Sequence, residues 1–202
     1  MVTREIKMQR KFLDVIKTYK DQPHVEVELR LGTLQEGVRS SRFETNVGKE
    51  AFDYVKRGLD KYRGWDKVVE SSTEVFYNDN KRQTEDEEGN IESIVKTKIK
   101  NIDQRMEGKK FDVRLGMSKE VPAVVEEGQE IEYDRSVVKE RKSYVRKDVS
   151  IDVTKVTGEF QDKDDEETEK YQIELEILNV ASKSDDELIN AIHKVECVLQ
   201  MF

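Results

Sequence analysis

The sequence predicts an α+β fold in which an antiparallel eight-stranded β-barrel is flanked by about three amphipathic helices. Between residues 65 and 180, apolar residues recur mostly at every second position, and polar turn sequences separate these runs. Helical spacings of three and four occur near both ends of the chain and around residue 55. Contiguous strands without intervening helices favour an antiparallel sheet or barrel over alternating strands and helices.

The composition narrows the class of protein. Charged residues form 40% of the 202-residue chain, against roughly 25% in ordinary globular proteins, and the net charge is −8. This balance opposes binding along a long stretch of nucleic acid, although a compact basic pocket is compatible with it. The single cysteine, Cys197, fits a reducing compartment. No signal peptide or membrane-spanning run is present in the sequence. We therefore expect one soluble, intracellular domain over residues 1–202 and no membrane partner.

The N-terminal third contains two helices and one strand. Residues 3–20 space their apolar side chains mostly by three and four, which predicts an amphipathic helix that ends before Pro23. Residues 24–31, HVEVELRL, alternate strictly between apolar and charged residues, as in a strand with one fully charged face. Residues 49–63 again have helical spacing, and Gly64 follows as a stop signal.

The rest of the barrel is predicted over residues 24–180, and a last helix follows it. Polar turns are expected at residues 78–90, 121–129 and 158–169. The last helix is expected at residues 184–200, where Ser184 and Glu187 form a capping-box pattern. Further strands are expected at residues 73–78, 91–101, 110–118, 136–146, 148–156 and 169–178.

The charged faces of these strands carry like charges at neighbouring positions. Acidic pairs occur in residues 26–28 and 174–176, and basic pairs in residues 96–98 and 139–141. One interpretation is a half-buried sheet with its charged face in water. Like charges side by side bring mild repulsion on such a face and no benefit. We therefore favour a barrel whose charged faces point inward around a ligand and whose apolar faces contact the helices.

A charged interior restricts the kind of ligand. Two converging ExE strands offer four carboxylates, which as hard oxygen donors suit Mg²⁺ or Mn²⁺ rather than zinc. The lysines and arginines require an anion that also binds that metal. A polyphosphate meets both requirements.

Seven sequence motifs, in consistent order over residues 24–178, resemble the triphosphate tunnel metalloenzymes, and within them the RNA triphosphatases of the fungal, protozoan and large-DNA-virus mRNA-capping type. The two ExE strands resemble the N-terminal and C-terminal metal motifs of that family. The motifs are VEVELRLG (25–32), FYNDNKRQT (76–84), SIVKTKI (93–99), FDVRLGMSKEVP (111–122), VKERKSY (138–144), SIDVTKV (150–156) and YQIELEI (171–177).

The resemblance implies a divalent-metal-dependent hydrolase that removes the γ-phosphate from triphosphate-ended RNA, the first step of mRNA cap formation. It implies that Asp152 pairs with the basic residues and that Glu120 or Glu174 orients the attacking water. The implied catalytic residues are Glu120, Glu174, Asp152, Arg82, Lys96, Lys139 and Arg141. The implied phosphate-binding residues are Arg82, Lys96, Arg114, Lys139 and Arg141, and the implied ligands of Mn²⁺ or Mg²⁺ are Glu26, Glu28 and Glu176.

The resemblance also implies partners. These are the 5′-triphosphate end of RNA, free nucleoside triphosphates, and an mRNA guanylyltransferase that is either separate or fused. The sequence is compatible with either a monomer or a homodimer. It is also compatible with a location in the nucleus or in a viral replication compartment.

Two positions depart from the family pattern, and three alternative functions stay open. Ser150 stands where some members have an arginine, and Gln172 stands where the C-terminal motif often has a third acid. The first alternative is a tunnel hydrolase of inorganic tripolyphosphate or thiamine triphosphate, a branch whose usual ExExK is ExExR in this chain at residues 26–30. The second is a non-catalytic polyphosphate-binding module, and the third is a β-rich domain with charged outer faces.

Overall fold

The computed structural model describes residues 4–37, 41–123, 133–158 and 168–202. Within these ranges, nine strands form one sheet in the order β2-β1-β6-β5-β4-β3-β7-β8-β9, and β9 pairs back onto β1. The elements are α1 (Arg4–Tyr19), β1 (Val25–Glu36), β2 (Ser41–Glu44), α2 (Lys49–Lys61), β3 (Lys67–Asn78), β4 (Lys81–Asp86), β5 (Ile91–Gln104), β6 (Asp112–Pro122), β7 (Arg135–Arg146), β8 (Val149–Gly158), β9 (Glu169–Ile177), a 3₁₀ turn (Val180–Ser182) and α3 (Asp185–Leu199).

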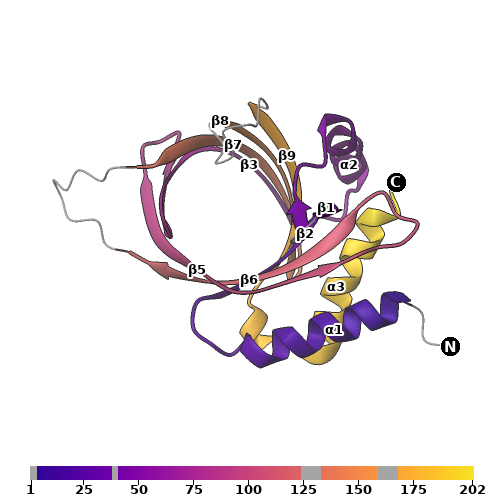
Figure 1. Ribbon diagram of the computed structural model, residues 1–202. Helices are drawn as coiled ribbons and strands as arrows, with labels where there is room; N and C mark the ends of the chain where they lie inside the picture. Colours follow the sequence, from indigo (N-terminus) through magenta and orange to yellow (C-terminus); the bar gives the residue numbers. More distant parts are fainter. Residues whose placement is uncertain (1–3, 38–40, 124–132, 159–167) are drawn as a thin grey trace.

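The predicted fold class is confirmed. Eight strands close into an antiparallel barrel, seen along its axis in Figure 1, and three α-helices flank it. β2 is an extra strand, which pairs with the end of β1 through a register that begins at Thr33 and Glu44. Helix α3 begins with the predicted capping box, in which Ser184 and Glu187 each bond the backbone N–H of the other.

Two strands were absent from the sequence prediction. β4 lies inside residues 78–90, which were predicted to be a turn, and this prediction is wrong. Its sequence, KRQTED, has no apolar alternation because neither of its faces packs against the apolar core. β2 has only four residues, too few for a periodic signal. The predicted turn at 121–129 also begins too early, since β6 continues to Pro122; residues 124–129 and 159–167 lie outside the described ranges.

The hydrophobic core lies between the helices and one wall of the barrel. Figure 1 shows all three helices on the side of β1, β6 and β9, whereas the opposite side of the barrel carries no helix. Val27, Leu29 and Leu31 of β1 point toward the helices and are completely buried, together with Phe12 of α1 and Ile192 of α3. The apolar side of HVEVELRL therefore faces outward, which leaves its charged side facing the barrel interior. None of the described helices has both the length and the apolar character needed to span a bilayer.

The stability of the fold is expected to depend on this covered wall. We expect Leu29→Ala to lower the free energy of unfolding by about 2–5 kcal/mol, because it leaves a cavity under the helices. Val138→Ala on the outer face of β7, where Val138 is 41% exposed, is the control and is expected to cost less than about 1 kcal/mol. Urea denaturation measures both changes. Equal losses in the two variants would contradict the proposed location of the core.

Candidate active site

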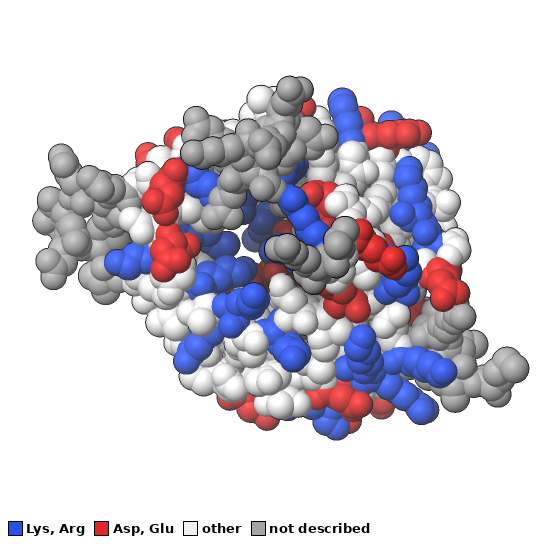
Figure 2. Space-filling model, in the orientation of Figure 1, with Lys and Arg blue, Asp and Glu red and all other residues white. Residues whose placement is uncertain are grey.

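The barrel encloses a cavity of about 750 Å³. Among the described residues that line it, eight are basic and six are acidic, although the whole chain has a net charge of −8. Figure 2 shows basic side chains around the hollow that leads into it. Most of the acids come from β1 and β9, whereas several of the bases come from β4, β5 and β7. The interior is therefore a basic compartment with one acidic wall.

The two ExE strands meet where β1 and β9 close the barrel. Glu28 lies directly opposite Glu176 in the strand register, and Arg30 lies opposite Glu174. Arg30 joins the two strands, since its Nη2 lies 2.7 Å from Oε1 of Glu28 and its Nε lies 2.8 Å from Oε1 of Glu174. The closure of the barrel thus brings together residues that are almost 150 positions apart in the sequence.

The acidic wall is only partly neutralised. Burial raises the pKa of Glu28, an effect that the neighbouring Arg30 does not fully offset. Burial, together with the charges of Glu26 and Asp152, raises the pKa of Glu176 to about 7. Glu174 differs, because Arg30 and Arg141 outweigh the effect of burial and hold its pKa below the ordinary value. Glu28 and Glu176 are therefore the two acids of this wall whose ionised forms the surroundings stabilise least.

A second charged group joins β1, β4, β5 and β6. Lys96 Nζ lies 2.6 Å from Oε2 of Glu26 and 2.8 Å from Oε1 of Glu120. Arg82 Nη2 donates to the same Glu120 oxygen at 3.2 Å, and Ser118 Oγ donates to Glu26 at 2.9 Å. Burial would raise the pKa of Glu26, but Lys96 outweighs it and lowers that pKa. Glu120 is therefore held between two cations at the edge of the cavity.

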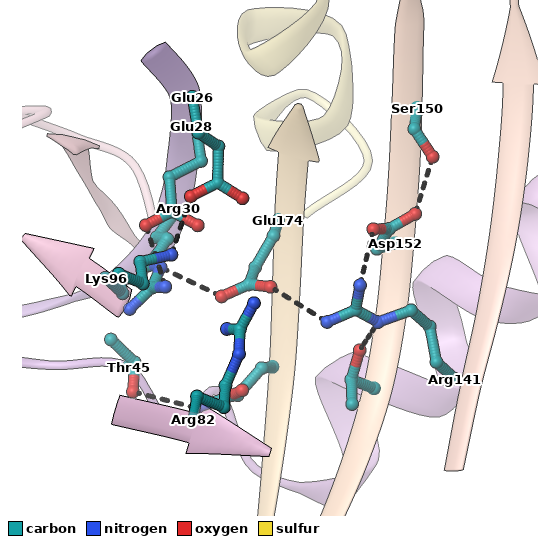
Figure 3. A network of polar contacts seen from close by, with 12 residues as sticks. Glu26, Glu28, Arg30, Thr45, Arg82, Lys96, Arg141, Ser150, Asp152 and Glu174 are labelled. Atoms are coloured by element: carbon teal, nitrogen blue, oxygen red, sulfur yellow. Dashed lines mark hydrogen bonds and ion pairs between the residues drawn. The ribbon is translucent and has the colours of Figure 1, made fainter. Parts of the chain in front are cut away.

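Arg141 is held at the base of the basic wall (Figure 3). Its Nη1 lies 3.4 Å from Oδ2 of Asp152, and its Nη2 lies 3.9 Å from Oε2 of Glu174. Its Nε donates to Oγ1 of Thr154 at 3.2 Å. Ser150 Oγ, in turn, donates to Asp152 at 2.6 Å, and both of these side chains are buried. The position that departs from the family pattern, Ser150, thus supports the acid that orients Arg141.

Lys139 differs from the other cations of the cavity. In the described part of the chain, its ammonium contacts Tyr77 rather than a carboxylate, and Nζ lies 5.9 Å from the centre of the ring. Burial lowers the pKa of Lys139, and the nearby Arg82 adds to this effect. An anion that enters the cavity can therefore pair with Lys139 without first displacing an acid.

Gly116 leaves space for Glu28. It lies opposite Glu28 in the register of β6 and β1. A Cβ atom at Gly116 would lie 3.0 Å from Oε1 and 3.3 Å from Cγ of Glu28. The absence of a side chain at this position lets the Glu28 carboxylate lie across the neighbouring strand.

Most of the residues singled out from the sequence come together, but Arg114 does not. The cavity lining includes the three predicted metal ligands and Arg82, Lys96, Lys139, Arg141, Asp152 and Glu174. Glu120 reaches this group through its ion pairs with Lys96 and Arg82. Arg114 is not among the described lining residues, because Asp103 binds its guanidinium at 2.6 and 2.9 Å and Phe43 packs over it at 4.7 Å.

Several lining residues were not singled out from the sequence. Arg30, Arg135, Lys170 and Tyr77 all line the cavity. Strand alternation carried a signal for three of them. Arg30 follows Glu28 by two positions, and Arg135 and Lys170 precede Lys139 and Glu174 by four, so each shares the inner face of its strand.

The acidic wall matches a hard divalent cation in the chemistry of its donors. Glu26, Glu28 and Glu176 supply carboxylate oxygens, and the raised pKa values of Glu28 and Glu176 indicate that their surroundings stabilise the ionised carboxylates poorly, as a bound cation would correct. In the ranges that the structure describes, no three such groups converge closely enough to hold an ion. Glu26 and Glu28 are turned toward Lys96 and Arg30 instead. The residues thus fit a metal in type, provided that these carboxylates turn toward it.

Three solved structures share the fold. The Schizosaccharomyces pombe Pct1 RNA triphosphatase matches with a TM-score of 0.79 and 19% identity, over 100% of this chain and 94% of that chain. The Mimivirus capping enzyme triphosphatase matches with a TM-score of 0.63 and 14% identity, over 96% and 97%. A chain of the S. pombe Mediator head module matches with a TM-score of 0.53 and 14% identity, over 88% and 96%. At such identities these likenesses establish the fold.

A family model establishes the family. No curated protein matches the sequence significantly. The model described as mRNA capping enzyme, beta chain, matches residues 59–202, which is more than half of the chain and includes every motif after the first ExE strand. The chain therefore belongs to the family of mRNA capping enzyme beta chains, the tunnel-fold RNA triphosphatases.

Proposed function

We propose that this chain, as a single domain, removes the γ-phosphate from triphosphate-ended RNA in a reaction that depends on Mn²⁺ or Mg²⁺, and that it also hydrolyses free nucleoside triphosphates. The observation that carries the proposal is the division of charge inside the barrel. Glu26, Glu28 and Glu176 line the wall of β1 and β9, and Lys139 on β7 contacts Tyr77 rather than a carboxylate in the described ranges. A metal-bound triphosphate complements both walls.

The basic residues bind and orient the phosphates. Arg82, Lys96 and Lys139 neutralise the negative charge of the triphosphate and hold it for in-line attack, a reaction in which positioning and electrostatics supply most of the catalysis. Arg141 is fixed by Asp152 and Thr154, so its guanidinium is oriented before substrate enters. Glu120 or Glu174 orients the attacking water.

Glu26, Glu28 and Glu176 would hold the divalent cation. When bound, such an ion polarises the transferred phosphoryl group and offsets its developing charge. Glu26 and Glu28 would have to turn away from Lys96 and Arg30 to hold it, which would leave Lys96 better able to contact phosphate, while Arg30 would keep its ion pair with Glu174.

The partners follow from the place of this reaction in cap formation. The diphosphate end that remains is the substrate of an mRNA guanylyltransferase, and we propose that enzyme as a partner, within the nucleus or a viral replication compartment. The Pct1 RNA triphosphatase has been solved in complex with the Spt5 CTD. The acidic net charge suits an enzyme that needs only the RNA end, because a long nucleic-acid footprint requires a basic outer face.

The substrate assignment is tested by phosphate release from four substrates side by side. We expect release from triphosphate-ended RNA and from ATP, and only with Mn²⁺ or Mg²⁺. Strong preference for thiamine triphosphate or inorganic tripolyphosphate would assign the chain to that branch of the fold instead. Tight, metal-independent binding without turnover would support the non-catalytic alternative.

The metal ligands are tested by substitution. We expect Glu28→Ala and Glu176→Ala each to lower kcat by about 100-fold or more, comparable to the loss of a major electrostatic element. Glu74→Ala, on the exposed outer face of β3, is the matched control and should keep normal turnover. Circular dichroism checks that the variants are folded. Near-normal turnover in both inner variants would remove the metal assignment.

The raised pKa of Glu176 predicts a pH dependence of stability. Its folded pKa of about 7 lies above its ordinary value of 4.5, so ionised Glu176 destabilises the metal-free protein increasingly as the pH rises from 4.5 to 7, and fully above 7. We expect Glu176→Gln to stabilise the metal-free protein at pH 8 by up to about 3 kcal/mol, and to have little effect at pH 4.

Thermal unfolding at the two pH values measures this difference. Added Mg²⁺ or Mn²⁺ should reverse the order at pH 8, because it stabilises only the protein that has the carboxylate. A Glu176→Gln variant less stable than the wild type at pH 8 without metal would contradict the prediction.

A further inference from the structure

One section of the cavity wall is apolar, and the proposed reaction at the phosphates does not account for it. Val75, Val137 and Val156 line the cavity on β3, β7 and β8, and all three are almost completely buried. They form a cluster of their own, separate from the main core under the helices. Triphosphate binding gives no reason for valines to replace polar residues on this part of the wall.

Tyr77 is the member of this patch that has surface left to offer a ligand. It packs against the three valines, it is only partly buried, and it is the one aromatic side chain among the described residues of the lining. The guanidinium of Arg135, directly opposite on β7, stacks on the Tyr77 ring with Cζ 4.0 Å from its centre. Stacked aromatic and guanidinium planes are the surfaces on which proteins hold nucleobases.

The order of residues along β7 also matches the order of groups in the proposed substrate. On the inner face of β7, Arg141 is followed toward the start of the strand by Lys139, Val137 and Arg135. Arg141 contacts the acids near the metal wall, and Lys139 comes next. In a triphosphate-ended RNA, the γ-phosphate is followed by the β- and α-phosphates and then by the first nucleoside. A substrate with its γ-phosphate toward Glu176 therefore places its nucleoside beside Val137, Tyr77 and Arg135.

We infer that Tyr77 and Arg135, backed by the three valines, form a subsite for the nucleoside of the first nucleotide, and that this subsite lets the enzyme discriminate nucleotide-bearing triphosphates from inorganic polyphosphate. The identity of the ligand rests on the proposed function. The aromatic ring and the guanidinium supply stacking surface that every base can use, so the subsite distinguishes nucleotides from bare phosphate rather than one base from another.

The test compares two ligands that each carry two phosphates and differ by a nucleoside. Calorimetry measures the binding of ADP and of pyrophosphate without turnover of a triphosphate, and the ratio of the two dissociation constants isolates the contribution of the nucleoside. We expect the wild type to bind ADP roughly tenfold more tightly than pyrophosphate, as one stacked base allows. Equal affinity, or tighter binding of pyrophosphate, would overturn the inference.

Variants then assign the preference to the patch. Tyr77→Leu and Arg135→Gln should each remove most of the preference for ADP, roughly tenfold for Tyr77→Leu. Tyr77→Phe keeps the ring and should keep the ratio, even if loss of the hydroxyl that faces Lys139 weakens both ligands together. Arg146→Gln is the matched control, because Arg146 lies on the same strand as Arg135 and is exposed. Its Cζ lies over the ring of Tyr62, 5.2 Å from the ring centre.

The outcomes separate this inference from the proposed function. A loss of affinity for both ligands by the same factor in Tyr77→Leu and Arg135→Gln would show a purely structural or phosphate-binding role and overturn the subsite. If Tyr77→Leu does not fold, Arg135→Gln and the wild-type ratio still decide the matter. A wild type that prefers ADP but releases no phosphate from RNA or ATP would retain the nucleoside subsite and refute hydrolysis.

Discussion

The pairing of β9 with β1 is the constraint on which the site depends. It extends over only three residue pairs, and the middle pair, Leu29 and Leu175, points outward and is completely buried. The pairs on either side, Glu28 with Glu176 and Arg30 with Glu174, point inward. Burial of the apolar side thus holds four charged groups against one another inside the barrel, and closure also removes the free edges of the sheet. In an open sheet the two ExE strands would lie far apart, with β9 at one end and only β2 beyond β1 at the other.

Closure of the barrel buries charged side chains, and the effect on their pKa values differs from residue to residue. Lys96 outweighs the effect of burial on Glu26, and Arg30 does so for Glu174, so the pKa of each of these acids is lowered. Burial and the neighbouring acids raise the pKa of Glu176, while burial lowers the pKa of Lys139 on β7. The charged forms of Glu176 and Lys139 are therefore both disfavoured in the empty barrel. A ligand with a cation at one end and an anion at the other stabilises both charged forms, which is what preorganisation for a metal-bound phosphate requires.

The sequence predicted the parts of this fold that depend on periodicity. Strict alternation in HVEVELRL and YQIELEIL located the two ExE strands, and helical spacing located the covering helices, because each of these elements has one apolar face. β4 was missed because neither of its faces packs against the core, so Arg82 was identified only from the motif that it resembles. The pairing of Arg114 with Asp103 could not be predicted either, since it depends on strand register and on Phe43 of the unpredicted β2. Alternation assigns a side chain to the inner face, but only the packing around it decides whether it reaches the cavity.

In the proposed function, the inner face of strand β7 serves both to bind phosphate and to discriminate between substrates. Its inner face runs Arg141, Lys139, Val137 and Arg135, so a single interruption by valine separates two basic sections. The inner basic pair lies within reach of the acidic wall, whereas Arg135 is stacked on Tyr77 and is directed toward a flat ligand rather than toward phosphate. A continuous run of cations would attract any polyphosphate along its whole length. An apolar break after Lys139 limits the length of anion that the wall accepts, and it favours a substrate whose charge ends where a nucleoside begins.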